Sequence, residues 1–172
     1  MGSVTLNGAT SGQITLQPTA VAGTNTVTVA AQTGTLNVAG PAFHANAGGA
    51  QTVTSGTNTL VTLVEDFDTN SNFASNRFTP TVAGYYQINA VTWATAGTSM
   101  TYTGALIYKN GTQYSLGYGA AWSSTGASGS VSDIVYLNGS TDYVELYIRV
   151  SGTGTLTVSN NTSFSGCLIR GA

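Results

Sequence analysis

The sequence predicts an all-β fold, and three features carry that prediction. Hydrophobic residues make up 41% of the 172 positions, enough for a sizeable core, whereas charged residues make up only 6%. Short runs of alternating apolar and polar residues are separated by Gly, Pro and Asn, which is typical of strands joined by turns. The pair Asn110-Gly111, lying between Tyr108 and Tyr114, is a strong signal for a two-residue hairpin.

Residues 76–93, NRFTPTVAGYYQINAVTW, form the stretch around which the other predicted strands are arranged. Pro80 and Gly84 mark a turn, and a run of aromatic and β-branched residues follows it. Alternation predicts one strand face of Tyr86, Ile88 and Ala90 and an opposite face of Tyr85, Gln87 and Asn89. We therefore expect one of the two tyrosines, Tyr85 or Tyr86, to point into the core and the other to point outward, toward a neighbouring subunit.

The chain divides into a short N-terminal β segment, residues 1–40, and a main domain, residues 41–172, at Gly40-Pro41. The N-terminal segment holds four alternating runs separated by turn residues: Val4–Leu6, Gln13–Leu16, Thr26–Val29 and Thr35–Val38. Each run buries too little apolar area to be stable alone. Association of three copies would supply the missing contacts.

The main domain continues the strand pattern to its last residues. Val53 to Val64 predicts strands around a Ser-Gly-Thr-Asn turn, and residues 131–150 predict two strands across Asn138-Gly139. Residues 118–129 are rich in Gly and Ser and predict a loop. Residues 163–169 form the expected closing strand.

Four blocks of the main domain resemble, in order, the complement component 1q globular-head family. They are Pro41–Ala45, then Phe78–Pro80 with Ala83–Tyr86, then Leu106–Gly111, and finally Ser163–Ile169. The resemblance implies a jelly-roll β-sandwich of about ten antiparallel strands that assembles as a compact homotrimer. It also implies core or trimer-contact roles for Phe78, Tyr85, Tyr86 and Phe164. The acidic residue usual at one strand entry of the family is missing from Asn138–Val144, and the chain has no collagen-like stalk.

The N-terminal segment resembles a different group, the tail-fibre and virion-surface proteins of bacteriophages. The residues that carry this resemblance are 10–16, 20–29 and 33–36. It implies that the segment anchors the trimer to other virion proteins while the head faces the host or the environment.

Charge and hydropathy exclude several partners. The net charge is −2 and only four residues are basic, too few to track a nucleic-acid backbone. No run approaches the roughly 20 apolar residues of a membrane span, so we expect no membrane insertion. The start of the sequence lacks a basic segment followed by an apolar run, so no signal peptide is predicted.

Two groups of residues are candidate ligand sites. Glu65, Asp66 and Asp68 form the only acidic cluster, which is either a calcium site or a solvated strand end. Tyr118 and Trp122, in the predicted Gly/Ser-rich loop, are either anchors folded back on the body or part of a binding surface.

Catalytic residues are not evident, and we predict that the protein is not an enzyme. The only histidine, His44, and the only cysteine, Cys167, fall in the first and last strands of the expected jelly roll, which would make them neighbours. Neither residue has an acidic neighbour in sequence, so structural roles are expected, with Cys167 buried as free cysteines usually are. No cofactor is predicted beyond the candidate calcium.

The function expected from these features is that of a structural virion protein. It would be a short trimeric fibre or surface projection of a phage tail or capsid, assembled in the host cytoplasm, with a head that binds a host receptor or glycan. The alternative is a secreted or cell-surface trimeric binding module of a bacterium.

Overall fold

The computed structural model describes residues 4–7, 13–16 and 40–172, and these are all-β with no helix among them. The chain separates into two compact units, Met1–Gly34 and Thr35–Ala172. In the first unit, β1 (Val4–Asn7) pairs with β2 (Gln13–Leu16) in antiparallel register, with Val4 opposite Leu16. The other two predicted N-terminal runs, Thr26–Val29 and Thr35–Val38, lie outside the described residues.

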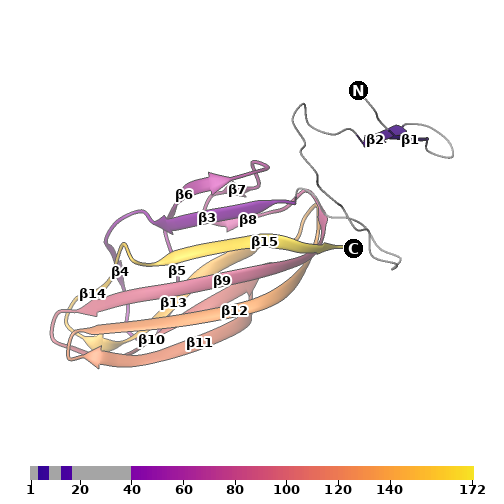
Figure 1. Ribbon diagram of the computed structural model, residues 1–172. Coiled ribbons are helices and arrows are strands. Elements are labelled where there is room, and N and C mark those ends of the chain that lie inside the picture. The colour runs from indigo at the N-terminus through magenta and orange to yellow at the C-terminus, as the bar shows by residue number, and fades with distance from the viewer. Residues whose placement is uncertain (1–3, 8–12, 17–39) are drawn as a thin grey trace, which may run out of the picture. The chain divides into compact units, whose positions relative to one another are not determined.

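The described part of the second unit, residues 40–172, contains thirteen strands, which Figure 1 shows. The early strands are β3 (Ala42–Ala47), β4 (Gln51–Val53), β5 (Asn58–Leu60), β6 (Leu63–Asp68), β7 (Phe73–Ala74) and β8 (Arg77–Phe78). The later ones are β9 (Ala83–Ala96), β10 (Ser99–Lys109), β11 (Thr112–Ser123), β12 (Gly126–Asn138), β13 (Val144–Thr153), β14 (Leu156–Val158) and β15 (Ser163–Gly171).

Ten strands follow one continuous hydrogen-bonded path. Its order is β6-β3-β15-β9-β12-β11-β10-β13-β8-β7, and every pairing along it is antiparallel. One layer consists of β6, β3, β15, β9 and β12, the other contains β10, β13, β8 and β7, and β11 joins them (Figure 1). The first and last strands of the second unit, β3 and β15, lie side by side. The predicted jelly roll of about ten antiparallel strands is thereby confirmed.

The core lies between the two layers and is centred on packed aromatic rings. The ring of Phe43 lies 4.2 Å from that of Phe78, 5.4 Å from that of Phe73 and 5.1 Å from that of Phe164, measured between centroids. Phe78 also makes an edge contact with Tyr86 at 5.7 Å. Phe43, Phe78, Phe164 and Tyr86 are at most 1% exposed. Aromatic side chains bury more apolar area per residue than others, so these rings contribute strongly to the stability of the core.

Strand β9 shows the predicted alternation along its whole length. Every second residue from Gly84 to Ala96 is buried, including Tyr86, Ile88 and Ala90, while the residues between them are partly or fully exposed. Thirteen consecutive residues of β9 pair with β12, and its other edge pairs with β15 and β14. This central strand is therefore the one on which the layer is built.

The β10–β11 hairpin confirms the predicted turn at Asn110-Gly111, where both residues have positive φ, 52° and 76°. Such a turn matches the twist of the flanking strands, and Asn and Gly tolerate it best. The predicted loop at residues 118–129 is wrong, because most of these residues belong to β11 and β12. Gly117 and Gly119 are not turn residues here. A Cβ atom on either would lie within 2 Å of a carbonyl oxygen of β12, so the two strands could not approach.

The predicted burial of Cys167 is also wrong, since its side chain is exposed. Strand β15 has one face in the core and one face outward. Phe164 and Gly166 occupy the core face, so Cys167 falls on the other, opposite Gln87 of β9. Strand parity here outweighs the general preference of free cysteine for the interior.

Candidate interaction surfaces

The three carboxylates proposed as a calcium site do not converge. Asp68 accepts hydrogen bonds from the backbone N–H groups of Asn70, Asn72 and Phe73, so it closes the turn after β6. Asp66 faces the His44 side chain, with 3.3 Å between Oδ2 and Nδ1, and Glu65 is exposed. Within residues 40–172 and the two described N-terminal strands, no three His, Cys, Asp or Glu side chains are grouped so that they could hold a metal ion.

His44 and Cys167 lie on the same outward face of neighbouring strands, but not directly opposite each other. Ser165 is the register partner of His44, and Ala42 is that of Cys167. The nearest titratable partner of His44 is instead Asp66, contributed by β6. His44 thus faces a carboxylate, but in the described residues no contact joins it to Cys167, so the nucleophile–base pairing of a catalytic triad is not formed.

Tyr85 and Tyr86 occupy opposite faces of β9. The Tyr86 hydroxyl donates a 2.7 Å hydrogen bond to the carbonyl oxygen of Val82, and burial raises the pKa of Tyr86 to about 12. Tyr85 is 44% exposed and contacts Tyr136 across the strand pair, with ring centroids 5.4 Å apart. Phe78 and Phe164, the other two residues that the family resemblance singled out, are fully buried.

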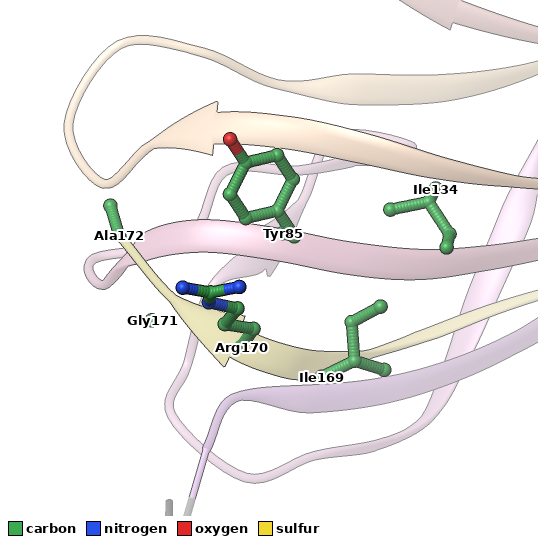
Figure 2. Close-up of a pocket in the computed structure, with 6 residues that line it drawn as sticks. All are labelled: Tyr85, Ile134, Ile169, Arg170, Gly171 and Ala172. Carbon is green, nitrogen blue, oxygen red and sulfur yellow. The ribbon is translucent and has the colours of Figure 1, made fainter. Parts of the chain in front are cut away.

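Tyr85 is part of an exposed apolar surface on β9, β12 and β15, which we call the Tyr85 patch. Its members are Tyr85, Ile134, Tyr136 and Ile169, and each is between 40% and 49% exposed. Figure 2 shows three of them around a shallow pocket of about 510 Å³, with Arg170 and the last two residues of the chain completing its wall. An apolar surface of this kind, contributed by three strands, is a candidate site for contact with another molecule.

A polar network borders the Tyr85 patch along β9 and β12. The Gln87 side-chain amide donates to the Ser132 hydroxyl at 2.8 Å, and that hydroxyl donates to the Asn89 side-chain oxygen at 2.8 Å. These groups satisfy one another within the sheet and carry no charge. An apolar centre with an uncharged polar margin is the usual composition of a protein interface.

Strand β11 presents a second set of exposed apolar side chains. They alternate along one face of the strand: Tyr114, Leu116, Tyr118 and Trp122. Trp122 packs edge-on against Trp93 at 5.2 Å, and Tyr118 against Tyr102 at 5.0 Å, so both rings are supported at one edge and exposed elsewhere. Each ring is therefore anchored against the body and also exposed, and a binding role for Tyr118 and Trp122 stays a prediction.

The sequence analysis missed Ile134, Tyr136 and Ile169. Ile134 and Tyr136 alternate with the buried Val135 and Leu137, which was a signal for an outward apolar face. Their proximity to Tyr85 depends on the β9–β12 register, in which Tyr136 is opposite Tyr85 and Ile134 opposite Gln87. Ile169 lies where the β15 register shifts, and strand parity alone does not predict the direction of such a residue.

Comparison with solved structures shows the same fold in three proteins. Murine APRIL matches with a TM-score of 0.58 and 12% identity, over 76% of this chain and 100% of that one. The globular domain of zebrafish complement 1qA protein gives 0.55 and 16%, over 77% and 99%. Eiger TNF from S. frugiperda gives 0.55 and 11%, over 77% and 93%.

No family model and no curated protein matches the sequence. At identities this low the structural likeness shows the fold, and it confirms the resemblance of the main domain to complement component 1q heads at that level. The matches lend no support to the resemblance of residues 1–40 to phage tail-fibre proteins. In the described residues, no helix is both long and apolar enough to cross a membrane.

Proposed function

We propose that this chain is the subunit of a homotrimeric binding module that carries out no catalysis. The observation that carries the proposal is the Tyr85 patch, whose aromatic and aliphatic side chains are exposed on the outer face of the β15-β9-β12 sheet. Aromatic residues are enriched at the centres of interfaces and charged residues are depleted there. The three copies follow from the family resemblance of the main domain.

The distribution of charge supports self-association. The whole chain has six acidic and four basic residues, so little charge is available to keep copies apart. Two of the basic side chains are already paired, Arg77 with Glu145 and Lys109 with Asp142. Side-chain hydrogen bonds from Asn110 and the nearby Lys109 lower the pKa of Asp142, so this carboxylate stays ionised and paired. A cyclic trimer would cover the Tyr85 patch on every copy.

Light scattering on the full chain tests the assembly, with an expected mass about three times the 17.5 kDa of one chain. Tyr85→Ser should weaken association by about 2 kcal/mol or more, as loss of an interface anchor does. Tyr86→Ser should instead unfold the subunit, since truncating a buried aromatic costs about 3–5 kcal/mol.

The matched control is Val64→Ser, which removes an exposed apolar side chain from β6, outside the patch. This variant should remain trimeric and folded. A monomeric wild-type chain, or a Tyr85→Ser variant that associates as strongly as Val64→Ser, would contradict the assembly proposed.

The finer form of the proposal places the trimer on a virion, as a short phage fibre or surface projection. Support comes from the low-complexity, strand-patterned residues 1–40, whose first part forms a unit separate from the jelly roll. A separate segment of this kind could attach the head to virion proteins. Immunogold labelling of phage particles from the producing host is expected to decorate the tail or capsid. Labelling of bacterial cell surfaces alone would favour the alternative, a secreted or cell-surface bacterial module.

A further inference from the structure

The outward face of β10, β11 and β13 is rich in tyrosine. Residues Ala105 and Ile107 of β10 and Leu146 and Ile148 of β13 point into the core. The outward positions include Tyr102 and Tyr108 of β10, Tyr118 of β11 and Tyr147 of β13, all partly or fully exposed. The tyrosines of this face lie on β10, β11 and β13, whereas the Tyr85 patch lies on β9, β12 and β15 (Figure 1).

Tyr102 and Tyr118 form an aromatic shelf at the β10–β11 end of this face. Their rings meet edge to face, with centroids 5.0 Å apart and planes inclined by 77°. The Tyr118 ring lies over Gly104, where a Cβ atom would come within 2.6 Å of Cε1, so the glycine makes room for the ring. A shallow pocket of about 430 Å³ opens beside the shelf, lined by Thr101, Tyr102, Tyr118, Gly119 and Ala120.

Tyr118 is 53% exposed, and within the described part of the chain neither the Tyr102 nor the Tyr118 hydroxyl makes a hydrogen bond. It therefore combines a flat apolar surface with free hydrogen-bonding groups at its edges, including the hydroxyl of Thr101. Thr101 is placed there by a register shift between β10 and β13. Bulges commonly redirect side chains next to binding sites.

Arg149 supplies a cation next to the shelf. Gly104 is the register partner of Tyr118 on one side and of Arg149 on the other, so only the glycine position separates them. In the described part of the chain no carboxylate pairs with Arg149, and its buried Nε atom makes no hydrogen bond. The nearest acid on β13, Glu145, is already paired with Arg77. The buried Nε is out of a ligand's reach, but the two terminal guanidinium nitrogens are not among the buried unsatisfied atoms, and an anionic ligand could pair with them.

We propose that Tyr102, Tyr118 and Arg149 form a binding site for an acidic saccharide. The apolar face of a sugar ring would stack on Tyr118, the sugar hydroxyls would reach Thr101 and the tyrosine hydroxyls, and Arg149 would bind a carboxylate or sulfate in bidentate fashion. A single arginine suits one anionic group and is too little for a nucleic-acid backbone. The inference rests on the proposed function as a binding module and names the ligand class that its head would recognise.

The test is titration calorimetry on the full chain with three probes: sialyllactose, which carries a carboxylate, a sulfated chondroitin disaccharide, and neutral lactose. Binding of one or both acidic probes, at least 10-fold tighter than lactose, supports the site. The stronger of the two identifies the anionic group. Arg149→Gln should weaken acidic-probe binding by 10-fold or more, and Arg149→Lys should recover part of it. Tyr118→Ala should abolish binding, whereas Tyr118→Phe, which keeps the ring, should retain most of it.

Tyr114→Ala serves as the matched control, because Tyr114 is a similarly exposed tyrosine, 49% against 53% for Tyr118, on the same face of β11 and outside the shelf. It should bind as the wild type does. Light scattering on each sample separates the two proposals. A monomer that binds acidic sugars through Arg149 would support the site and overturn the trimer. A trimer that binds no acidic probe, or that binds equally well in Arg149→Gln, would overturn the site.

Discussion

Tyr85 and Tyr86 show how a single step along a strand changes the role of a residue. Both are tyrosines in the same β9 backbone, yet one is 44% exposed and the other is fully buried. The difference is due to the two-residue period of the strand, which the sequence already displays. The Tyr86 hydroxyl keeps a hydrogen bond to Val82, as a buried polar group requires.

The buried hydroxyl of Tyr86 predicts a specific pH dependence. Its pKa is about 12 in the folded state against an ordinary value of 10.0, so the folded state retains the proton over this range. The protonated Tyr86 hydroxyl therefore contributes fully to the free energy of unfolding below pH 10, and this contribution is lost as the pH rises from 10 toward 12. The Tyr86→Phe variant has no hydroxyl to titrate and also lacks the hydrogen bond to Val82, and loss of that bond should lower its unfolding free energy by about 1 kcal/mol at neutral pH.

Urea unfolding from pH 7 to pH 11.5 measures this difference. The variant should be less stable at pH 7, and the gap to wild type should narrow above pH 10. Tyr147 also has a raised pKa, first because of desolvation and then because of Glu145, but it is present in both proteins. A gap that stays constant with pH would show that Tyr86 titrates alike in the folded and unfolded states.

Glu145 is a buried acid, and its carboxylate is paired with a single cation, Arg77. It is 3% exposed, and the Arg77 guanidinium donates to its carboxylate at 2.9 Å while stacking over the Tyr143 ring. Arg77→Ala would leave the carboxylate buried without a cation, at a cost of about 2 kcal/mol in unfolding free energy. Adding Glu145→Gln should recover part of this loss, since the amide carries no charge. Thermal and urea unfolding of both variants check the coupling, and a double variant no more stable than Arg77→Ala would argue against it.

At the scale of elements, the close pairing of β11 with β12 depends on two glycines whose role the sequence pattern does not reveal. Gly119 falls in the Gly/Ser-rich stretch 118–129 that was predicted to be a loop, but in the structure it and Gly117 allow two backbones to come close together. Local propensity cannot reveal this, because the reason lies in a strand that pairs with them across the sheet. The Asn110-Gly111 hairpin was predictable because its cause is local.

Gly119→Ala tests the close approach of these strands. A Cβ atom there would lie 1.6 Å from the Ser128 carbonyl oxygen, so one backbone must move. Overpacking of this kind costs about 3 kcal/mol or more in unfolding free energy when the obstacle is backbone. Ala120→Val, at the next position but pointing outward, should change stability by only about 0.5 kcal/mol. Equal stabilities for the two variants, measured by urea unfolding, would mean that β11 does not approach β12 in this way.

For the candidate surfaces too, features with a local cause could be predicted from the sequence, whereas features that depend on pairing between distant strands could not. Tyr85 was predictable as an outward residue because its alternation lies within one strand. The patch around it was not, since Ile134 and Ile169 join it through strand pairings that connect distant parts of the sequence. Likewise, Tyr118 and Trp122 were found by residue type, whereas Arg149 comes beside the shelf only through the register of three strands.

At the scale of the whole molecule, the aromatic core lies in residues 41–172. All tyrosines, phenylalanines and tryptophans of the sequence fall there, and residues 1–40 contain none. The closing strand β15, from the C-terminal end of the sequence, lies between β3 and β9 and pairs with both. The jelly roll therefore has its own core and its own closure.

This division predicts different outcomes for two truncations. Deleting residues 1–40 should leave a folded, soluble trimer, because the core residues remain, and this trimer should no longer attach to its particle. Deleting Ser163–Ile169 should abolish folding, since it removes Phe164 from the core and leaves the paired edges of β3 and β9 with unmatched donors and acceptors. Protease resistance and particle-binding assays on both truncations provide the measurement. If the first aggregates while the second stays folded, the core has been placed in the wrong part of the chain. If the first still binds the particle, residues 1–40 are not the anchor.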